Sequence, residues 1–194
     1  MLKFNNDFIN YYLRETEKLV WFKKPKIVFK KNENNHYAWF PDGRLNLYEN
    51  CISNNLKKRQ NKTAIITVNQ NKEIRKYSFI QIDKKVNKIS NYIKKISIKK
   101  KLRIMIHASA SLESAVLMFT CAKLGLHFSV IFEELESLGI QNRIKLFKPN
   151  IFFSRLSEKI FISKMGFKSY NKIKFIYGEQ LKKIIDAKEN AKKV

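Results

Sequence analysis

Residues 102–132 read LRIMIHASASLESAVLMFTCAKLGLHFSVIF, and this stretch decides the fold class. It opens and closes on short apolar runs, Leu102–His107 and His127–Phe132, with the apolar content that strands covered on both faces favour. The segment between them has the length and composition of a helix. The pattern therefore predicts two parallel strands joined by a helical crossover.

The connecting segment predicts a buried helix rather than part of a membrane span. Ser109 or Ser111 can cap its start, and Gly125 suits its end because glycine adopts a positive φ angle without strain. The most apolar part of the chain, residues 114–132, is interrupted at Lys123 and Gly125, and its two halves differ in character. We expect no membrane-spanning segment.

Upstream, the sequence predicts a hairpin followed by an amphipathic helix. Apolar runs at Ala64–Val68 and Ile74–Phe79 flank a polar connection. Ser78 is placed to cap a helix that extends to about Lys95. The apolar residues that give this helix one face lie three or four apart: Phe79, Ile82, Val86, Ile89 and Ile93.

Downstream, helices and short apolar strands continue to alternate. The predicted elements, in order, are a helix over Glu134–Phe147, a strand over Ile151–Phe153, a helix over Ser157–Met165, a strand over Lys174–Tyr177 and a helix from Glu179. Strands and helices that alternate at this spacing indicate an α/β fold with a mainly parallel sheet and flanking helices.

We divide the chain into two parts on this pattern. Residues 61–194 form the predicted α/β domain, and residues 1–60 form a lead segment that is irregular apart from a helix near Asp7–Val20. The 194 residues are 44% hydrophobic, enough to bury a core. Two cysteines, Cys51 and Cys121, cannot make a disulfide framework, so we expect a reducing, cytoplasmic location.

The chain is strongly basic, with 40 Lys and Arg against 16 Asp and Glu and a net charge of +24. The basic residues are spread over short groups: Lys23–Lys26, Lys30–Lys31, Lys57–Arg59, Lys84–Lys85, Lys94–Lys95, Lys99–Lys101 and Lys182–Lys183. This spread favours a solvated basic surface that attracts acidic partners non-specifically. Nucleic-acid binding through these lysines is the alternative.

The sequence contains few motifs that indicate a catalytic, metal-binding or phosphate-binding site. His36, His107 and His127 show no metal-ligand spacing, and no phosphate-binding loop or nucleophile elbow is present in the sequence. A strand-end or core position is the interpretation we favour for His107 and His127. Glu133, Glu134 and Glu136 follow a predicted strand, which is where α/β sheets place ligand-binding sites. We favour the alternative interpretation, that these three residues are carboxylates at a helix N-terminus, stabilised by the helix dipole.

A collinear set of motifs adds a family resemblance. Trp39–Asn50, WFPDGRLNLYEN, resembles the W-F-x-x-G-x-L-N-x-x-x-N segment of AMP-forming acetate– and propionate–CoA ligases, the acetyl-CoA synthetases. Further similar segments follow in the family's order: Lys62–Ile66 (KTAII), Tyr77–Ile82, Glu113–Gly125, His127–Phe132, and Arg143–Ile144 ahead of Lys148–Pro149. The resemblance implies the first part of the adenylate-forming ligase fold.

The resemblance also implies a reaction, in which ATP and Mg activate acetate or propionate as an acyl-adenylate before transfer to CoA. The family's phosphate-gripping loop, adenylate motifs and C-terminal lysine lie beyond the matched region. We therefore expect a truncated, split or degenerate ligase-like chain, a pseudoenzyme when alone, that needs no cofactor by itself.

The family's CoA-contact positions fall, by resemblance, on Phe132, Glu133 and Glu134, and the family has glycines at the last two of these positions. Carboxylates there replace open backbone and repel CoA phosphates, so we expect an eroded site. Lys159 and Lys164 lie nearby at a spacing that does not match the family's arginine pair. The expected partners are a complementary ligase chain, or an intact ligase protomer if the chain is a binding or regulatory module.

Overall fold

The computed structural model describes residues 6–31, 33, 36–97, 101–167, 170 and 172–186, so Lys99 and Lys100 of the basic groups lie outside the described residues. The chain forms two compact units, residues 1–58 and 59–194, and each is described by itself.

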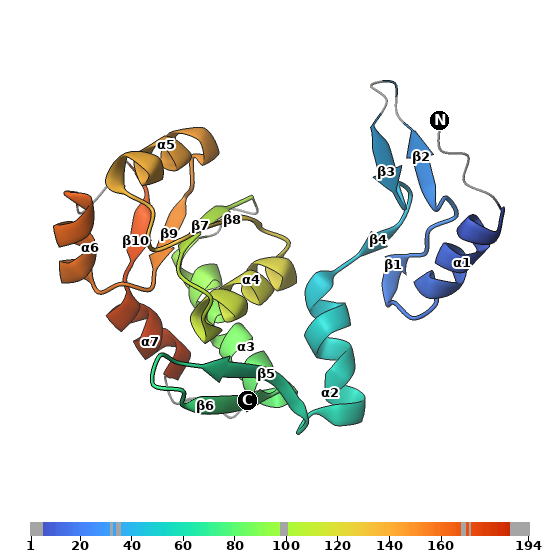
Figure 1. Cartoon of the computed structure of the whole chain (residues 1–194), viewed down its shortest axis with the longest axis horizontal. Coiled ribbons are helices and arrows are strands. Elements are labelled where there is room, and N and C mark those ends of the chain that lie inside the picture. Colours follow the sequence, from blue (N-terminus) through green and yellow to red (C-terminus); the bar gives the residue numbers. More distant parts are fainter. Residues whose placement is uncertain are drawn as a thin grey trace. The chain divides into compact units, whose positions relative to one another are not determined.

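The first unit holds α1, two small antiparallel sheets and η1, and it includes all of α2 except its last residue (Figure 1). The elements are α1 (Asn6–Thr16), β1 (Trp21–Lys23) paired with β4 (Arg44–Leu45), β2 (Phe29–Lys31) paired with β3 (Tyr37–Trp39), η1 (Glu49–Ser53) and α2 (Asn54–Arg59). The lead segment, which we predicted to be irregular apart from one helix, also contains short paired strands. Strands of two or three residues are too short to show a period of two in the sequence.

The helix predicted near Asp7–Val20 also ends earlier, at Thr16. A local hydrogen bond lies at its end, where the backbone oxygen of Thr16 accepts from the indole Nε1–H of Trp21 at 2.9 Å. Gly43 passes close to the same ring, where an added Cβ would lie 2.7 Å from Trp21. A larger side chain at position 43 would displace the Trp21 indole.

The second unit begins with the predicted hairpin and helix. β5 (Thr63–Val68) pairs antiparallel with β6 (Ile74–Ser78), and α3 (Phe79–Ile96) follows directly. Ser78 caps α3 through a reciprocal pair of hydrogen bonds, in which the Ser78 backbone N–H donates to the Gln81 side chain at 2.8 Å. These predictions are confirmed.

A four-stranded parallel sheet forms the centre of this unit. Its strands are β7 (Arg103–His107), β8 (His127–Ile131), β9 (Ile151–Ser154) and β10 (Lys174–Ile176), in the order β10-β9-β7-β8. The helices are α4 (Leu112–Leu124), α5 (Ser137–Phe147), α6 (Glu158–Met165) and α7 (Gly178–Asp186). The α/β class with a parallel sheet is therefore confirmed.

Helices cover both faces of the sheet (Figure 1). α5 and α6 pack on one face, where their buried residues join the side chains of Met105, Ile131 and Phe152. α3, α4 and α7 lie on the other face, against the residues of alternate register. α5 begins at Ser137 rather than at the predicted Glu134, because Glu136 has an extended backbone (φ −70°, ψ 162°).

The strand order creates a switch in the direction of the chain. From β7 the chain moves outward to the edge strand β8, then returns past β7 to β9. The loops that follow β7 and β9 therefore leave the sheet toward opposite faces, which opens a crevice at the carboxyl ends of these two strands. Ligands of open α/β sheets bind at such a point.

Candidate functional site

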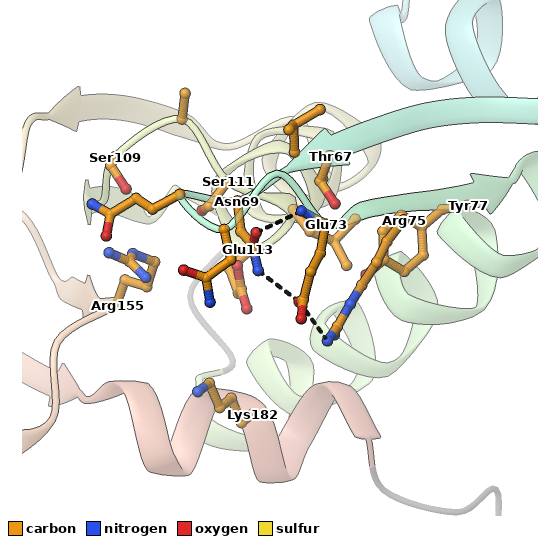
Figure 2. Close-up of a pocket in the computed structure, with 15 residues that line it drawn as sticks. Thr67, Asn69, Glu73, Arg75, Tyr77, Ser109, Ser111, Glu113, Arg155 and Lys182 are labelled. Carbon is orange, nitrogen blue, oxygen red and sulfur yellow. Dashed lines mark hydrogen bonds and ion pairs between the residues drawn. The ribbon is translucent and has the colours of Figure 1, made fainter.

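A pocket of about 650 Å³ lies beside this crevice. Figure 2 shows its walls: the β5–β6 hairpin on one side, Ser109, Ser111 and Glu113 around the start of α4, Arg155 after β9 and Lys182 on α7. Its lining is polar and carries charges of both signs, from Arg75, Arg155 and Lys182 and from Glu73 and Glu113. It does not concentrate one sign of charge, as a site that steers a charged ligand does.

The charges on the hairpin side of the pocket are largely used within the hairpin. The Asn69 amide donates to the Glu73 carboxylate at 2.7 Å, and the Glu73 backbone N–H donates back to the Asn69 side chain at 2.9 Å. Arg75 lies 3.9 Å from the same carboxylate (Figure 2). These contacts shape the turn, and an exposed pair such as Arg75–Glu73 adds little stability.

An ion pair with two hydrogen bonds, between Glu133 and Arg155, spans the crevice. Both oxygens of Glu133, after β8, accept hydrogen bonds from the Arg155 guanidinium, after β9, one of them from Nη2 at 2.7 Å. β7 lies between these two strands, so the pair spans its carboxyl end. The Glu133 side chain is only 8% exposed, whereas that of Arg155 is 40% exposed.

The environment of Glu133 favours its charged form. Burial raises its pKa, but the hydrogen bonds and charge of Arg155 and a hydrogen bond from the Ser109 backbone outweigh burial and leave the pKa below its usual value. The Lys164 ammonium donates to the Glu133 backbone oxygen at 2.8 Å. Glu133 thus ties together the segments after β7, β8 and β9 and the helix α6.

A histidine and a serine meet below this ion pair. His107 Nδ1 lies 3.0 Å from the Oγ of Ser154, and both residues are fully buried. Burial lowers the pKa of His107 to about 4, so the ring is neutral at pH 7. A serine–histidine contact can activate a nucleophile, but these side chains have no access to a substrate. The contact joins β7 to β9 and supports the core interpretation of His107.

The structure places the three predicted CoA-contact residues in different surroundings. Phe132 is 72% exposed and Glu134 is exposed, whereas Glu133 points inward to Arg155. The helix N-terminal interpretation is therefore wrong for Glu133, because a cationic partner outside α5 holds it. Glu136 does occupy the residue before α5, without a capping hydrogen bond from its side chain. That the three residues stand at the family's CoA contacts stays a prediction.

Sequence reasoning missed Arg155 and Ser154 as parts of this edge, and it named Lys164 only as a lysine near the CoA-contact positions. Arg155 is a charged residue directly after β9, and Glu133 is a charged residue two positions after the end of β8. Opposite charges that follow two predicted strands could have indicated an ion pair at the carboxyl edge of the sheet. Their pairing across β7 required the strand order, which the sequence pattern did not supply.

Other reactive groups were also considered. Cys121 is buried, and burial raises the pKa of its thiol to about 12, which makes it a poor nucleophile. Within the described ranges, no group of three or more His, Cys, Asp or Glu side chains is placed to hold a metal ion. None of the described helices is both long enough and apolar enough to span a bilayer.

Comparison with known proteins agrees with the motif order. Residues 3–51 match the family model described as "Acetyl-coenzyme A synthetase N-terminus", and residues 52–193 match the model described as "AMP-binding enzyme". The second match covers most of the chain and includes every strand of the parallel sheet. The resemblance stated from the motifs is thereby confirmed.

Individual relatives of the chain are acetyl-coenzyme A synthetases as well. The chain is 28% identical over 142 residues to the acetyl-coenzyme A synthetase of Pasteurella multocida, which covers 73% of this chain and 22% of the relative. It is 30% identical over 139 residues to that of Campylobacter jejuni, covering 71% and 21%, and 30% identical over 129 residues to that of Helicobacter pylori, covering 66% and 20%. The chain thus spans about a fifth of the length of these curated relatives.

Proposed function

Because the chain belongs to the AMP-binding enzyme family, we propose that it supplies the N-terminal portion of an acetyl-CoA synthetase-like ligase and does not complete the reaction alone. In the complete enzyme, ATP and Mg would activate acetate or a related short acid, and CoA would accept the acyl group. The two free cysteines suit a cytoplasmic location for such an enzyme.

One observation carries this proposal: the Glu133–Arg155 ion pair closes the carboxyl end of β7, at the crevice where the fold would otherwise receive a ligand. Both Arg155 and Lys164 are engaged by Glu133 at this point, Arg155 by the carboxylate and Lys164 by the backbone oxygen. Acyl-adenylate formation needs donors and cations that are already aimed at phosphate oxygens. The mixed charges of the adjoining pocket supply no such concentration.

The exposed Glu134 supports the proposal that this chain does not bind CoA by itself. Its carboxylate stands next to Phe132 on the solvent side of the turn, where it would repel a phosphate. A chain with this arrangement contributes a folded part of the ligase, while phosphate and CoA binding depend on residues supplied by the rest of an enzyme.

A graft tests this function. The 139-residue matched segment of the Campylobacter jejuni acetyl-coenzyme A synthetase is replaced by the corresponding segment of this chain, and acetate- and ATP-dependent formation of acetyl-CoA is measured. We expect the graft to form acetyl-CoA more slowly than the unmodified enzyme, because Glu134 and the Glu133–Arg155 pair are part of the grafted segment, and we expect no activity from this chain alone. The unmodified enzyme controls for the assay. Activity of the isolated chain, or a folded graft without activity, would overturn the proposal.

A binding or regulatory role is a second candidate, which exposed apolar side chains after and along β8 favour. In that case, the chain would pair with an intact ligase protomer and change its rate. Adding the purified chain to an intact acetyl-CoA synthetase tests this, and an unchanged rate over a wide range of concentrations contradicts it.

A further inference from the structure

The pocket of about 650 Å³ beside the crevice contains one charge of each sign that is not used in an ion pair. Arg75 and Glu73 pair within the hairpin, and Arg155 is held by a glutamate outside the pocket. Glu113 and Lys182 also line the pocket, and neither forms a hydrogen bond or an ion pair with another described residue. The pocket therefore presents both a carboxylate and an ammonium group to a ligand.

Two different helices hold these charges. Glu113 is half-buried in the first turn of α4, where the helix dipole favours a carboxylate. Lys182 is exposed on α7, and Figure 2 shows it with Glu113 and Arg155 in the wall of the pocket. Both helices are anchored by buried residues, so a ligand can bridge the two charges with little cost in ordering the protein.

Arg155 adds a second cationic group beside Lys182. These two residues also line a neighbouring pocket of about 350 Å³. The carboxylate of Glu133 uses Nε and Nη2 of Arg155, which leaves Nη1 for a ligand on a side chain that is 40% exposed. The hydrogen bonds of Glu133 raise the pKa of Arg155, and the charge of Glu113 adds to this rise. Glu113 is therefore near enough to Arg155 for one small ligand to contact both.

We propose that this pocket binds a zwitterion of the amino-acid or short-peptide class, with its carboxylate on Lys182 and Arg155 and its ammonium on Glu113. The proposal goes beyond the proposed function, which assigns no ligand to the pocket. A purely anionic ligand would meet the Glu113 carboxylate, and a purely cationic one would meet Lys182 and Arg155. A ligand with both charges, at opposite ends, pairs with all three groups.

The volume and the uncharged lining favour a short peptide over a single amino acid. Pockets of about 300–1,000 Å³ hold drug-sized molecules, and a single small amino acid would leave much of this pocket to water. The amide side chains of Gln70 and Asn71 and the hydroxyl of Ser109 also line it. Each of these groups can both donate and accept hydrogen bonds, as a peptide group requires.

Calorimetric titration of the full chain with the dipeptide L-alanyl-L-alanine tests the site. Free L-alanine separates a peptide from an amino acid as the ligand. N-acetyl-alanylalanine lacks the ammonium, and alanylalanine amide lacks the carboxylate. Glu113→Gln and Lys182→Gln remove the two charges of the protein one at a time. Lys183→Gln is the matched control, because Lys183 is the next residue of α7, is also exposed and does not line the pocket.

We expect saturable one-to-one binding of the dipeptide, which Glu113→Gln and Lys182→Gln each weaken about tenfold or more and Lys183→Gln leaves within about twofold. Acetylation and amidation of the dipeptide should each weaken binding by a similar factor. Glu113→Gln should not weaken the acetylated probe further, because the charge that Glu113 would contact is already gone. Tighter binding of free alanine than of the dipeptide supports the site with an amino acid as its ligand.

Three outcomes would overturn the proposal: no saturable binding of either zwitterion, binding of the acetylated or amidated probe as tight as that of the dipeptide, or an equal loss in Lys183→Gln. Pyrophosphate that binds more tightly than the dipeptide would indicate an anion site instead and would also overturn it. The modified probes are tested on the unsubstituted chain, so the result does not depend on whether a variant folds. Acetyl-CoA formation by the graft is a separate readout, so either proposal can fail without the other.

Discussion

Glu133 and Arg155 differ in solvent exposure, and this difference decides how much stability is lost when either one is replaced. The Arg155 side chain is 40% exposed and can turn toward water if its partner is lost, whereas that of Glu133 is 8% exposed and cannot. A buried charge without a partner carries a large desolvation cost. Replacing Arg155 alone should therefore lower the free energy of unfolding more than replacing Glu133 alone.

We expect Arg155→Ala to lower the free energy of unfolding by about 3 kcal/mol or more, and Glu133→Ala to lower it by about 1–2 kcal/mol. Urea unfolding at pH 7 measures both. Arg75→Ala is the control, because its ion pair with Glu73 is exposed and its removal should change stability by less than about 0.5 kcal/mol. Equal losses at positions 133 and 155 would contradict this account.

His107 should make stability depend on pH in mildly acidic solution. The unfolded chain binds a proton at this residue near pH 6.5, but burial delays protonation of the folded chain to about pH 4. Because the unfolded state holds more protons in this window, the free energy of unfolding falls as the pH falls from 6.5 to 4, by about 3 kcal/mol for this group. His107→Asn should remove that component, while the exposed His127→Asn should retain it.

At the scale of the element, single residues fix the helix boundaries. Ser111 caps the start of α4, and Gly125 ends it with φ +64°. Gly178 starts α7 so close to the loop after β9 that an added Cβ would lie 2.1 Å from the Arg155 backbone oxygen. Small residues at these points let the loops after β9 and β10 approach each other at the carboxyl edge of the sheet.

The cap of α3 gives a prediction at this scale. Ser78→Ala removes the side chain that accepts from the Gln81 backbone N–H, and we expect a loss of about 1 kcal/mol in the free energy of unfolding. Lys84→Ala, at an exposed position of the same helix, should change it by less than about 0.5 kcal/mol. A neutral result for Ser78→Ala would mean that packing alone fixes the start of α3.

Gly178 gives a second prediction for an element. Gly178→Ala should push α7 away from the loop after β9 and destabilise the protein by about 2 kcal/mol or more, since backbone atoms cannot move aside as a flexible side chain can. Gly166→Ala compares a glycine with open space around its Cβ but a φ of +71°, where about 1 kcal/mol is expected from strain alone. Thermal unfolding of both variants separates the two causes.

At the scale of the whole molecule, the net charge of +24 acts through many separated lysines. Such a surface binds polyanions by release of counterions, so affinity falls steeply with salt. We expect weak binding of a mixed-sequence DNA duplex that is lost between about 50 and 200 mM salt and is insensitive to any single Lys→Ala change. Salt-resistant binding that depends on one lysine group would instead support a dedicated nucleic-acid site.

Most of the second unit could be predicted from the sequence. The apolar runs of β7 and β8, the serine caps of α3 and α4 and the glycine after α4 are local signals, because they depend on contacts within a few residues. The motif order that resembles acetyl-CoA synthetases was likewise readable without a structure. The short strands β1–β4 were not, since their pairing depends on residues distant in the chain.

The candidate site depended on tertiary structure. The sequence by itself determined that Glu133 follows one strand and Arg155 another, and that α4 is mostly apolar between Glu113 and Lys123. Only the strand order brought those two charges together across the end of β7, and only the packing showed which side of α4 and β8 stays exposed. The physical reason is that local propensity acts over a few residues, whereas ion pairing and burial depend on distances in the folded chain.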